Sequence, residues 1–161
     1  MTVDLVIDKN LLLPRLKFHT QNEALTYLAD QLYKQGKVKA EYRAAILKRE
    51  DEYPTGLPST KPAVAIPHAD YNLVNETSLA VGTLEQPISF HNMEDVKSTL
   101  DVEIIIMMAI SEPHGQVEML QRIVSLIQNE ELRKKILDAT TSDQLQQLIT
   151  PILLTNELKE N

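Results

Sequence analysis

Four histidines are the residues of this chain best suited to chemistry near neutral pH. The chain has no cysteine, which excludes a thiol nucleophile, a disulfide framework and a cysteine-based zinc site. The motifs G-x-x-x-x-G-K-[ST], G-x-G-x-x-G, H-E-x-x-H and G-x-S-x-G are also missing, so nucleotide-binding, zinc-protease and serine-hydrolase functions lack their motifs. The histidines therefore carry the search for a site.

The four histidines differ in their sequence settings. We interpret His19, just before the first predicted helix, and His91, in a polar turn, as surface residues. His68 follows Pro67 at the end of a short apolar strand, and a rigid loop end is where reactive groups are often held. Neutral imidazole is a good nucleophile near pH 7. From spacing alone, His68 is either such a nucleophile or a hydrogen-bonded histidine at a strand end.

The elements before His68 are predicted from capping and proline patterns. Thr20 and Glu23 have the spacing of a capping box, which opens a helix that Gly36 ends. A second helix is predicted over about residues 39–50. Half of the chain's eight prolines fall in residues 51–67. We therefore expect a long rigid loop there, with one short strand over Ala63–Ile66.

The elements after His68 alternate strands and helices. Strands are predicted over Ser78–Leu84 and Val102–Ile110, and the second is apolar on both faces, which indicates a central strand covered by helices. An amphipathic helix follows Pro113. Asn129 is expected to cap the next helix, and the basic residues Arg133, Lys134 and Lys135 late in it suit the helix dipole. A capping box of Thr141 with Gln144 predicts a short last helix, which Pro151 is expected to stop.

This order predicts an α/β fold, a three-layer α/β/α sandwich around a small mixed sheet in a single domain. We expect the domain to occupy residues 1–155 and residues 156–161 to be a frayed tail. The longest apolar run, Ile104–Ile110, is too short to span a bilayer, and no signal peptide is visible. A cytoplasmic protein without direct membrane insertion is therefore expected.

The charge balance also limits the partners. Lys and Arg number 16 against 23 Asp and Glu, a net charge of −7, and aromatic residues make up only 4%. Binding to nucleic acid depends on local positive charge and stacking platforms, so no nucleic-acid partner is expected. No cofactor or metal site is predicted, and the oligomeric state stays open.

Two runs of residues resemble a known family. Arg49-Glu50 with Tyr53-Pro54-Thr55-Gly56-Leu57 resembles the pattern R-E-x-x-[FY]-P-T-G-[LI], and Ala65-Ile66-Pro67-His68-Ala69-Asp70 resembles A-I-P-H-[ACT]-[DE]. Both patterns are typical of EIIA components of the phosphoenolpyruvate-dependent sugar phosphotransferase system, of the mannitol/fructose-type fold and its galactitol-like branch. The resemblance extends from about Thr20 to Ile149.

The resemblance implies a phosphotransferase component with a phosphohistidine intermediate. His68 would accept a phosphoryl group from HPr and pass it to a cysteine of a IIB component, for uptake of galactitol or a related sugar. An alternative within the family is a regulatory, nitrogen-type EIIA whose phosphorylation state controls a partner. A metal-binding protein using His68, His114 and acidic residues is a third possibility, which the missing ligand spacing disfavours.

The resemblance also suggests helpers for His68. Arg49 would supply a forked cation to the phosphoryl oxygens, although its position also suits a cation at a helix C-terminus. Mannitol-type relatives have a second histidine at the start of the helix after Pro113, and alignment of the apolar residues places Gln116 there. We rank Gln116 above His114, two residues earlier, with surface capping as the alternative for both. The resemblance favours Nε2 of His68 as the reacting atom, and Asp70 stays unassigned.

Overall fold

The computed structural model describes residues 7–154, apart from the side chains of residues 114–116 and 154. One mixed five-stranded sheet has the order β1-β4-β5-β3-β2. Its strands are β1 (Leu12–Leu16), β2 (Gly56–Leu57), β3 (Ala63–Ala65), β4 (Ser78–His91) and β5 (Thr99–Ala109). β4 and β2 pair antiparallel with β5 and β3, whereas β1 pairs parallel with β4 and β3 parallel with β5.

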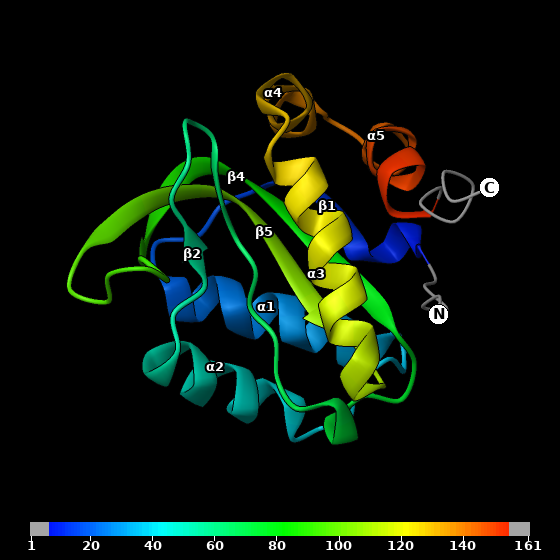
Figure 1. Cartoon of the computed structure of the whole chain (residues 1–161). Helices are drawn as coiled ribbons and strands as arrows, with labels where there is room; N and C mark the ends of the chain where they lie inside the picture. Colours follow the sequence, from blue (N-terminus) through cyan, green and yellow to red (C-terminus); the bar gives the residue numbers. More distant parts are fainter. Residues whose placement is uncertain (1–6, 155–161) are drawn as a thin grey trace.

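Helices cover both faces of the sheet, as predicted (Figure 1). One layer holds α1 (Gln21–Lys34) and α2 (Tyr42–Glu52), and the other holds α3 (Pro113–Ile127), α4 (Glu130–Asp138) and α5 (Ser142–Leu154). Short 3₁₀ turns, η1 (Lys9–Leu11) and η2 (Tyr71–Leu73), join the elements. None of the helices within residues 7–154 has the length and apolarity that a bilayer crossing requires.

The central position predicted for the strand over Val102–Ile110 is confirmed by β5. Its alternate side chains enter two separate cores: Ile105 and Met107 pack with the α1 and α2 side, and Ile104 and Ile106 with the α3 to α5 side. All four are buried. A strand buried on both faces needs consecutive apolar residues, and the run Ile104–Ile110 supplies them, whereas Asp101 and Glu103 lie in the less buried first half of β5.

The predicted helix caps are confirmed. Thr20 Oγ1 accepts from the Glu23 N–H at 3.2 Å, and the Glu23 carboxylate accepts from the Thr20 N–H at 3.1 Å. The Asn129 side chain accepts from the Leu132 N–H at 3.0 Å, and Thr141 with Gln144 forms the second reciprocal pair. The second helix begins at Tyr42, later than the expected residue 39.

Prolines misled the sequence prediction in several places. Pro151 lies inside α5 and does not stop it: the proline removes only its own N–H from the helical ladder, and Leu153 beyond it is buried. β4 continues past Leu84 to His91 through Pro87, which lies at a register irregularity between Thr83 and Ile88. Strand β1, which contains Pro14, was not predicted; it lies at the sheet edge, where proline is tolerated.

The predicted loop over 51–67 contains a strand that the sequence did not indicate, the two-residue β2. The expected boundary at residue 155 and the frayed tail over 156–161 lie outside the described residues and stay predictions.

Candidate active site

His68 lies just beyond β3, beside the carboxyl end of the central strand. It forms a parallel bridge with Met108 of β5, and the Met108 N–H donates to the Pro67 carbonyl at 2.9 Å. The buried Tyr42 hydroxyl, at the start of α2, donates to the Met108 carbonyl at 2.5 Å. The carboxyl end of β5 is therefore fixed to α2, and the half-buried His68 side chain lies on a rigid support.

The His68 ring has a defined hydrogen-bond partner. Its Nδ1 lies 3.0 Å from the Ile66 carbonyl oxygen. A carbonyl oxygen only accepts, so Nδ1 carries the hydrogen and donates, and the lone pair of the neutral ring is at Nε2. Burial lowers the pKa of His68 below its ordinary value, the Ile66 carbonyl opposes this shift, and the Arg49 charge lowers the pKa further. These effects together favour a neutral ring.

Arg49 lies in the last turn of α2, close enough to influence the charge of His68. Its guanidinium lies over the Tyr53 ring, with the carbon Cζ 5.6 Å from the ring centroid. Its Nε is buried and has no hydrogen-bond partner among the described residues. Buried donors normally find an acceptor. Arg122 also has a buried Nε without a partner among the described residues, but its other nitrogens donate to the Leu153 carbonyl at 2.8 Å and to Glu118 at 2.7 Å. The arrangement of Arg49 suits an incoming anion.

A cavity of about 300 Å³ adjoins Arg49 and Tyr53. Arg49, Tyr53 and Lys48 line it from α2 and its end, and Ala69 and Asp70, which directly follow His68, line the other side. Asp70 is exposed and caps η2 without a side-chain hydrogen bond, so its role stays unassigned. The cavity is open to the surface, and its lining includes two cations, Lys48 and Arg49, and two carboxylates, Glu52 and Asp70. Arg49 is the cation among them whose charge also acts on His68.

The sequence prediction missed the residues that hold this site in place. The Glu50 carboxylate accepts from the Thr55 N–H at 2.8 Å and from the Thr55 hydroxyl at 2.7 Å. Burial raises the pKa of the Glu50 carboxyl above its ordinary value, although both bonds from Thr55 act to lower it. The available signal was the run from Arg49-Glu50 to Thr55-Gly56, which places a carboxylate in the last turn of a helix and a threonine just after its end.

The two candidate helpers, His114 and Gln116, belong to the first turn of α3. That turn follows β5 directly after the edge where Met108 meets His68. The side chains of His114 and Gln116 lie outside the described residues, so the choice between them stays a prediction.

The other two histidines have exposed side chains. His91 ends β4, and its Nδ1 lies 3.0 Å from the Val96 carbonyl oxygen. His19 immediately precedes the cap of α1. Within the described part of the chain, no three His, Asp or Glu side chains gather closely enough to hold a metal ion.

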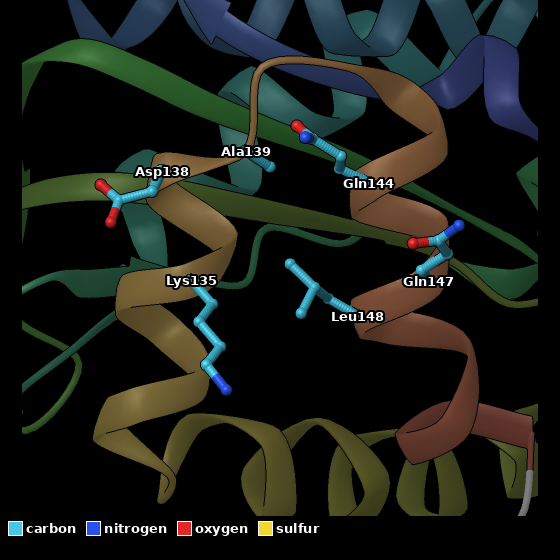
Figure 2. Close-up of a pocket in the computed structure, with 6 residues that line it drawn as sticks. All are labelled: Lys135, Asp138, Ala139, Gln144, Gln147 and Leu148. Atoms are coloured by element: carbon cyan, nitrogen blue, oxygen red, sulfur yellow. The ribbon is translucent and has the colours of Figure 1, made fainter.

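A second cavity, of about 320 Å³, lies between α4 and α5 (Figure 2). Its lining side chains are those of Lys135, Asp138, Ala139, Gln144, Gln147 and Leu148. The Gln144 Oε1 already accepts from the Thr140 N–H at 2.7 Å as part of a helix cap. This cavity contains no histidine, and the candidate nucleophile lies at the other end of α3.

Comparison with known proteins identifies the family of the chain. The family model described as phosphoenolpyruvate-dependent sugar phosphotransferase system, EIIA 2, matches residues 5–151. The galactitol-specific EIIA component of Escherichia coli strain K12 is 23% identical over 143 residues, which cover 88% of this chain and 93% of that protein. The fructose-specific EIIABC component of Bacillus subtilis strain 168 is 25% identical over 153 residues, which cover 92% of this chain and 23% of that protein.

The chain is much shorter than some relatives. It covers 20% of the 2-O-alpha-mannosyl-D-glycerate-specific EIIABC component of Escherichia coli strain K12, at 25% identity over 134 residues or 80% of this chain. The match to that protein and to the fructose-specific component is therefore a match to about a fifth of their length.

Solved structures share the fold. IIA in the complex of enzyme IIAMTL with phosphorylated IIBMTL from Escherichia coli superposes with a TM-score of 0.75 at 23% identity, covering 91% of this chain and 98% of that one. The nitrogen regulatory protein IIA-Ntr from Neisseria meningitidis gives 0.71 at 14% identity, covering 90% and 97%. With the family model matching most of its length, the chain belongs to the EIIA 2 family and is a component of the phosphoenolpyruvate-dependent sugar phosphotransferase system.

Proposed function

We propose that His68 is the phosphoryl carrier of this EIIA component, accepting the group from HPr and passing it to a cysteine of a IIB component. The observation that carries the proposal is the bond from Nδ1 to the Ile66 carbonyl, beside Arg49 and an open cavity. That bond leaves the Nε2 lone pair available for attack.

The proposed transfer is a direct displacement at phosphorus by Nε2 of His68. The Nε2 lone pair forms the new bond to phosphorus, and the bond between phosphorus and the donor breaks with its electron pair leaving on the donor. Nδ1 keeps its hydrogen and its bond to Ile66 throughout. The second transfer reverses this at Nε2, with a IIB thiolate as the attacking group. Such a reaction needs alignment and charge stabilisation more than covalent assistance.

Arg49 supplies the charge stabilisation in this proposal. A phosphoryl group carries about −1.5 to −2 charges near neutral pH, and the free Nε of Arg49 is a ready donor for one of its oxygens. We assign the second donor to Gln116 in preference to His114, because the sequence register places Gln116 at the position of the helper histidine of mannitol-type relatives. Single-turnover transfer should separate the two, with Gln116→Ala slowed more than His114→Ala.

The partners would dock on the surface around His68. Tyr53 is 63% exposed beside Arg49, and Leu57 of β2 is partly exposed. Contacts between transient partners are usually small, below roughly 1,200 Å² in total. The related IIAMTL was solved as a complex with phosphorylated IIBMTL, which supports a IIB partner here as well. We place this exchange in the cytoplasm.

The sugar is assigned by likeness alone. The galactitol-specific relative has nearly the same length as this chain, which supports galactitol or a related sugar. A IIB component of galactitol type should then accept the phosphoryl group. Failure of every sugar-specific IIB to accept it, with His68 still labelled, would favour a regulatory EIIA.

The central experiment uses the full chain with enzyme I, HPr and labelled phosphoenolpyruvate. We expect one acid-labile phosphoryl group on His68, which His68→Ala abolishes while the far-ultraviolet circular dichroism spectrum stays unchanged. His19→Ala, which changes an exposed histidine just before the cap of α1, is the matched control and should label normally. Label that persists in His68→Ala would overturn the proposal.

A further inference from the structure

Glu50 is a buried carboxylate that the proposed transfer does not use. It is 3% exposed and lies next to Arg49, yet its two hydrogen bonds are both with Thr55. A buried carboxylate is costly unless its oxygens are well bonded, so the Thr55 N–H and hydroxyl are strongly held partners. Glu50 therefore fixes the position of Thr55 relative to α2.

Thr55 connects in turn to the strand that carries His68. The Thr55 carbonyl accepts from the Ile66 N–H at 3.2 Å, and β2 continues this contact with Gly56 opposite Ala65. On its other side, Gly56 approaches β4 so closely that an added Cβ would lie 2.6 Å from the His91 carbonyl oxygen. The backbone of Thr55 and Gly56 is therefore held in place by contacts with β3 on one side and β4 on the other.

The Ile66 residue held by Thr55 is the one whose carbonyl accepts from His68 Nδ1. A continuous series of contacts therefore runs from Glu50 through Thr55 and Ile66 to the imidazole. Each link is a hydrogen bond of ordinary length, between 2.7 and 3.2 Å. Displacement of Thr55 would move the Ile66 backbone, and with it the acceptor that decides which ring nitrogen carries the hydrogen.

We propose that Glu50 and Thr55 are positioning residues for His68, holding the Ile66 carbonyl against Nδ1 so that the Nε2 lone pair stays free. This inference rests on the proposed role of His68. Without a fixed acceptor at Nδ1, the hydrogen of the neutral ring redistributes to Nε2, and the molecules in that tautomer cannot attack phosphorus. Glu50 and Thr55 thereby act on transfer without touching the phosphoryl group.

The test measures the His68 tautomer by ring ¹⁵N chemical shifts, and single-turnover phosphorylation by phospho-HPr, in variants of the full chain. Glu50→Leu removes both bonds to Thr55, Thr55→Val removes the hydroxyl bond alone, and Glu50→Gln keeps an acceptor for the Thr55 N–H. We expect the largest increase in the Nε2–H tautomer and the slowest phosphorylation in Glu50→Leu, a smaller change in Thr55→Val, and the smallest in Glu50→Gln. Thr55→Val should be slowed roughly fivefold, the factor that one hydrogen bond of ordinary strength supplies.

Thr83→Val is the matched control, because the buried Thr83 hydroxyl accepts from the Arg15 N–H at 2.8 Å, away from β3. It should alter neither the tautomer nor the rate, and the concentration of HPr at half-maximal rate should stay constant in all variants. If Glu50→Leu does not fold, Thr55→Val carries the test, because it retains the main-chain bond to Glu50.

A wild-type tautomer and rate in folded Thr55→Val would overturn the inference. The tautomer is read without any phosphoryl donor, so it remains decisive even if wild-type His68 takes no label. In that case the proposed function fails while the positioning inference is still judged by the ring shifts.

Discussion

An arginine lies near each end of β3, and the two arginines differ in whether their N–H groups donate to the protein itself. Before the strand, Arg133 of α4 is 3% exposed and donates from Nε to the Pro62 carbonyl at 3.1 Å. Its other nitrogens donate to the Ile127 carbonyl and to Thr60, the latter through the carbonyl at 3.2 Å and the hydroxyl at 2.6 Å. Each nitrogen of this guanidinium is therefore committed to the protein itself.

After the strand, Arg49 keeps its Nε buried without a partner in the described part of the chain and faces an open cavity. Its contact with the Tyr53 ring orients the guanidinium without using an N–H donor. The contrast separates an arginine whose three nitrogens all donate to the protein from one that keeps a buried Nε without a partner in the described part of the chain. In the proposed function, that Nε donates to the phosphoryl group. The same distinction can be tested by substitution.

The largest expected effect is on stability, at the Arg133 end. Arg133→Met should lower the free energy of unfolding by about 3 kcal/mol or more, because each buried carbonyl left without a donor costs about 1–3 kcal/mol. Urea unfolding would measure the loss. Lys134→Met is the control, since Lys134 is exposed and forms only a surface pair with Glu130 at 3.5 Å, worth under about 1 kcal/mol. Similar midpoints for the two variants would contradict the structural role of Arg133.

The next effect is on transfer, at the Arg49 end. Arg49→Met should slow phosphorylation of His68 roughly ten- to a hundredfold, because a hydrogen bond to a charged group contributes ~1.5–3 kcal/mol. Its free energy of unfolding should change by less than about 1 kcal/mol, the size of a partly exposed contact with an aromatic ring. Single-turnover kinetics and urea unfolding measure the two. Arg43→Met, at an exposed arginine of the same helix paired with Asp30, should leave transfer unchanged.

A stability loss in Arg49→Met as large as that of Arg133→Met, with transfer intact, would remove the distinction between the two ends.

The smallest effect is on the titration of His68. Arg49→Met should raise the pKa of His68 but leave it below its ordinary value, because burial is the larger cause of the lowering. The pKa of His68 is lower in the folded protein than its value of 6.5 in the unfolded chain. At pH values between these two, the unfolded chain binds more protons than the folded protein. The free energy of unfolding of the wild type therefore falls as the pH drops from 6.5 through the folded pKa. The narrower gap in Arg49→Met should make this acid loss smaller. Nuclear magnetic resonance titration of the His68 ring and urea unfolding at several pH values measure both, and an unchanged pKa would refute the Arg49 contribution.

The sequence predicted those features that depend on nearby residues. The caps at Thr20 and Asn129 are confirmed because each joins residues within one helical turn. The prolines were harder to interpret, since Pro87 and Pro151 are tolerated at a strand irregularity and near a helix end that local patterns do not reveal.

The sequence interpretation of Arg133 shows the limit of local reasoning most clearly. A cation late in α4 fits the helix dipole, and Lys135 does lie in the last turn. Arg133 instead bonds to Pro62 and Thr60, which lie 71 and 73 positions away in the sequence. Its function follows from how α4 packs against the loop before β3, and no spacing within α4 contains that information.

By itself, the sequence determined the layers of the fold, through a strand apolar on both faces, and the position of His68 directly after a short buried strand. Only the tertiary structure decided that Arg49 lies beside the cavity, that Glu50 holds Thr55, and that the Ile66 carbonyl takes the Nδ1 hydrogen. Periodicity and capping join residues a few positions apart, so they can be read along the chain. Contacts between α2, β2 and β3 depend on the order of strands in the sheet, which is fixed only when both cores close together.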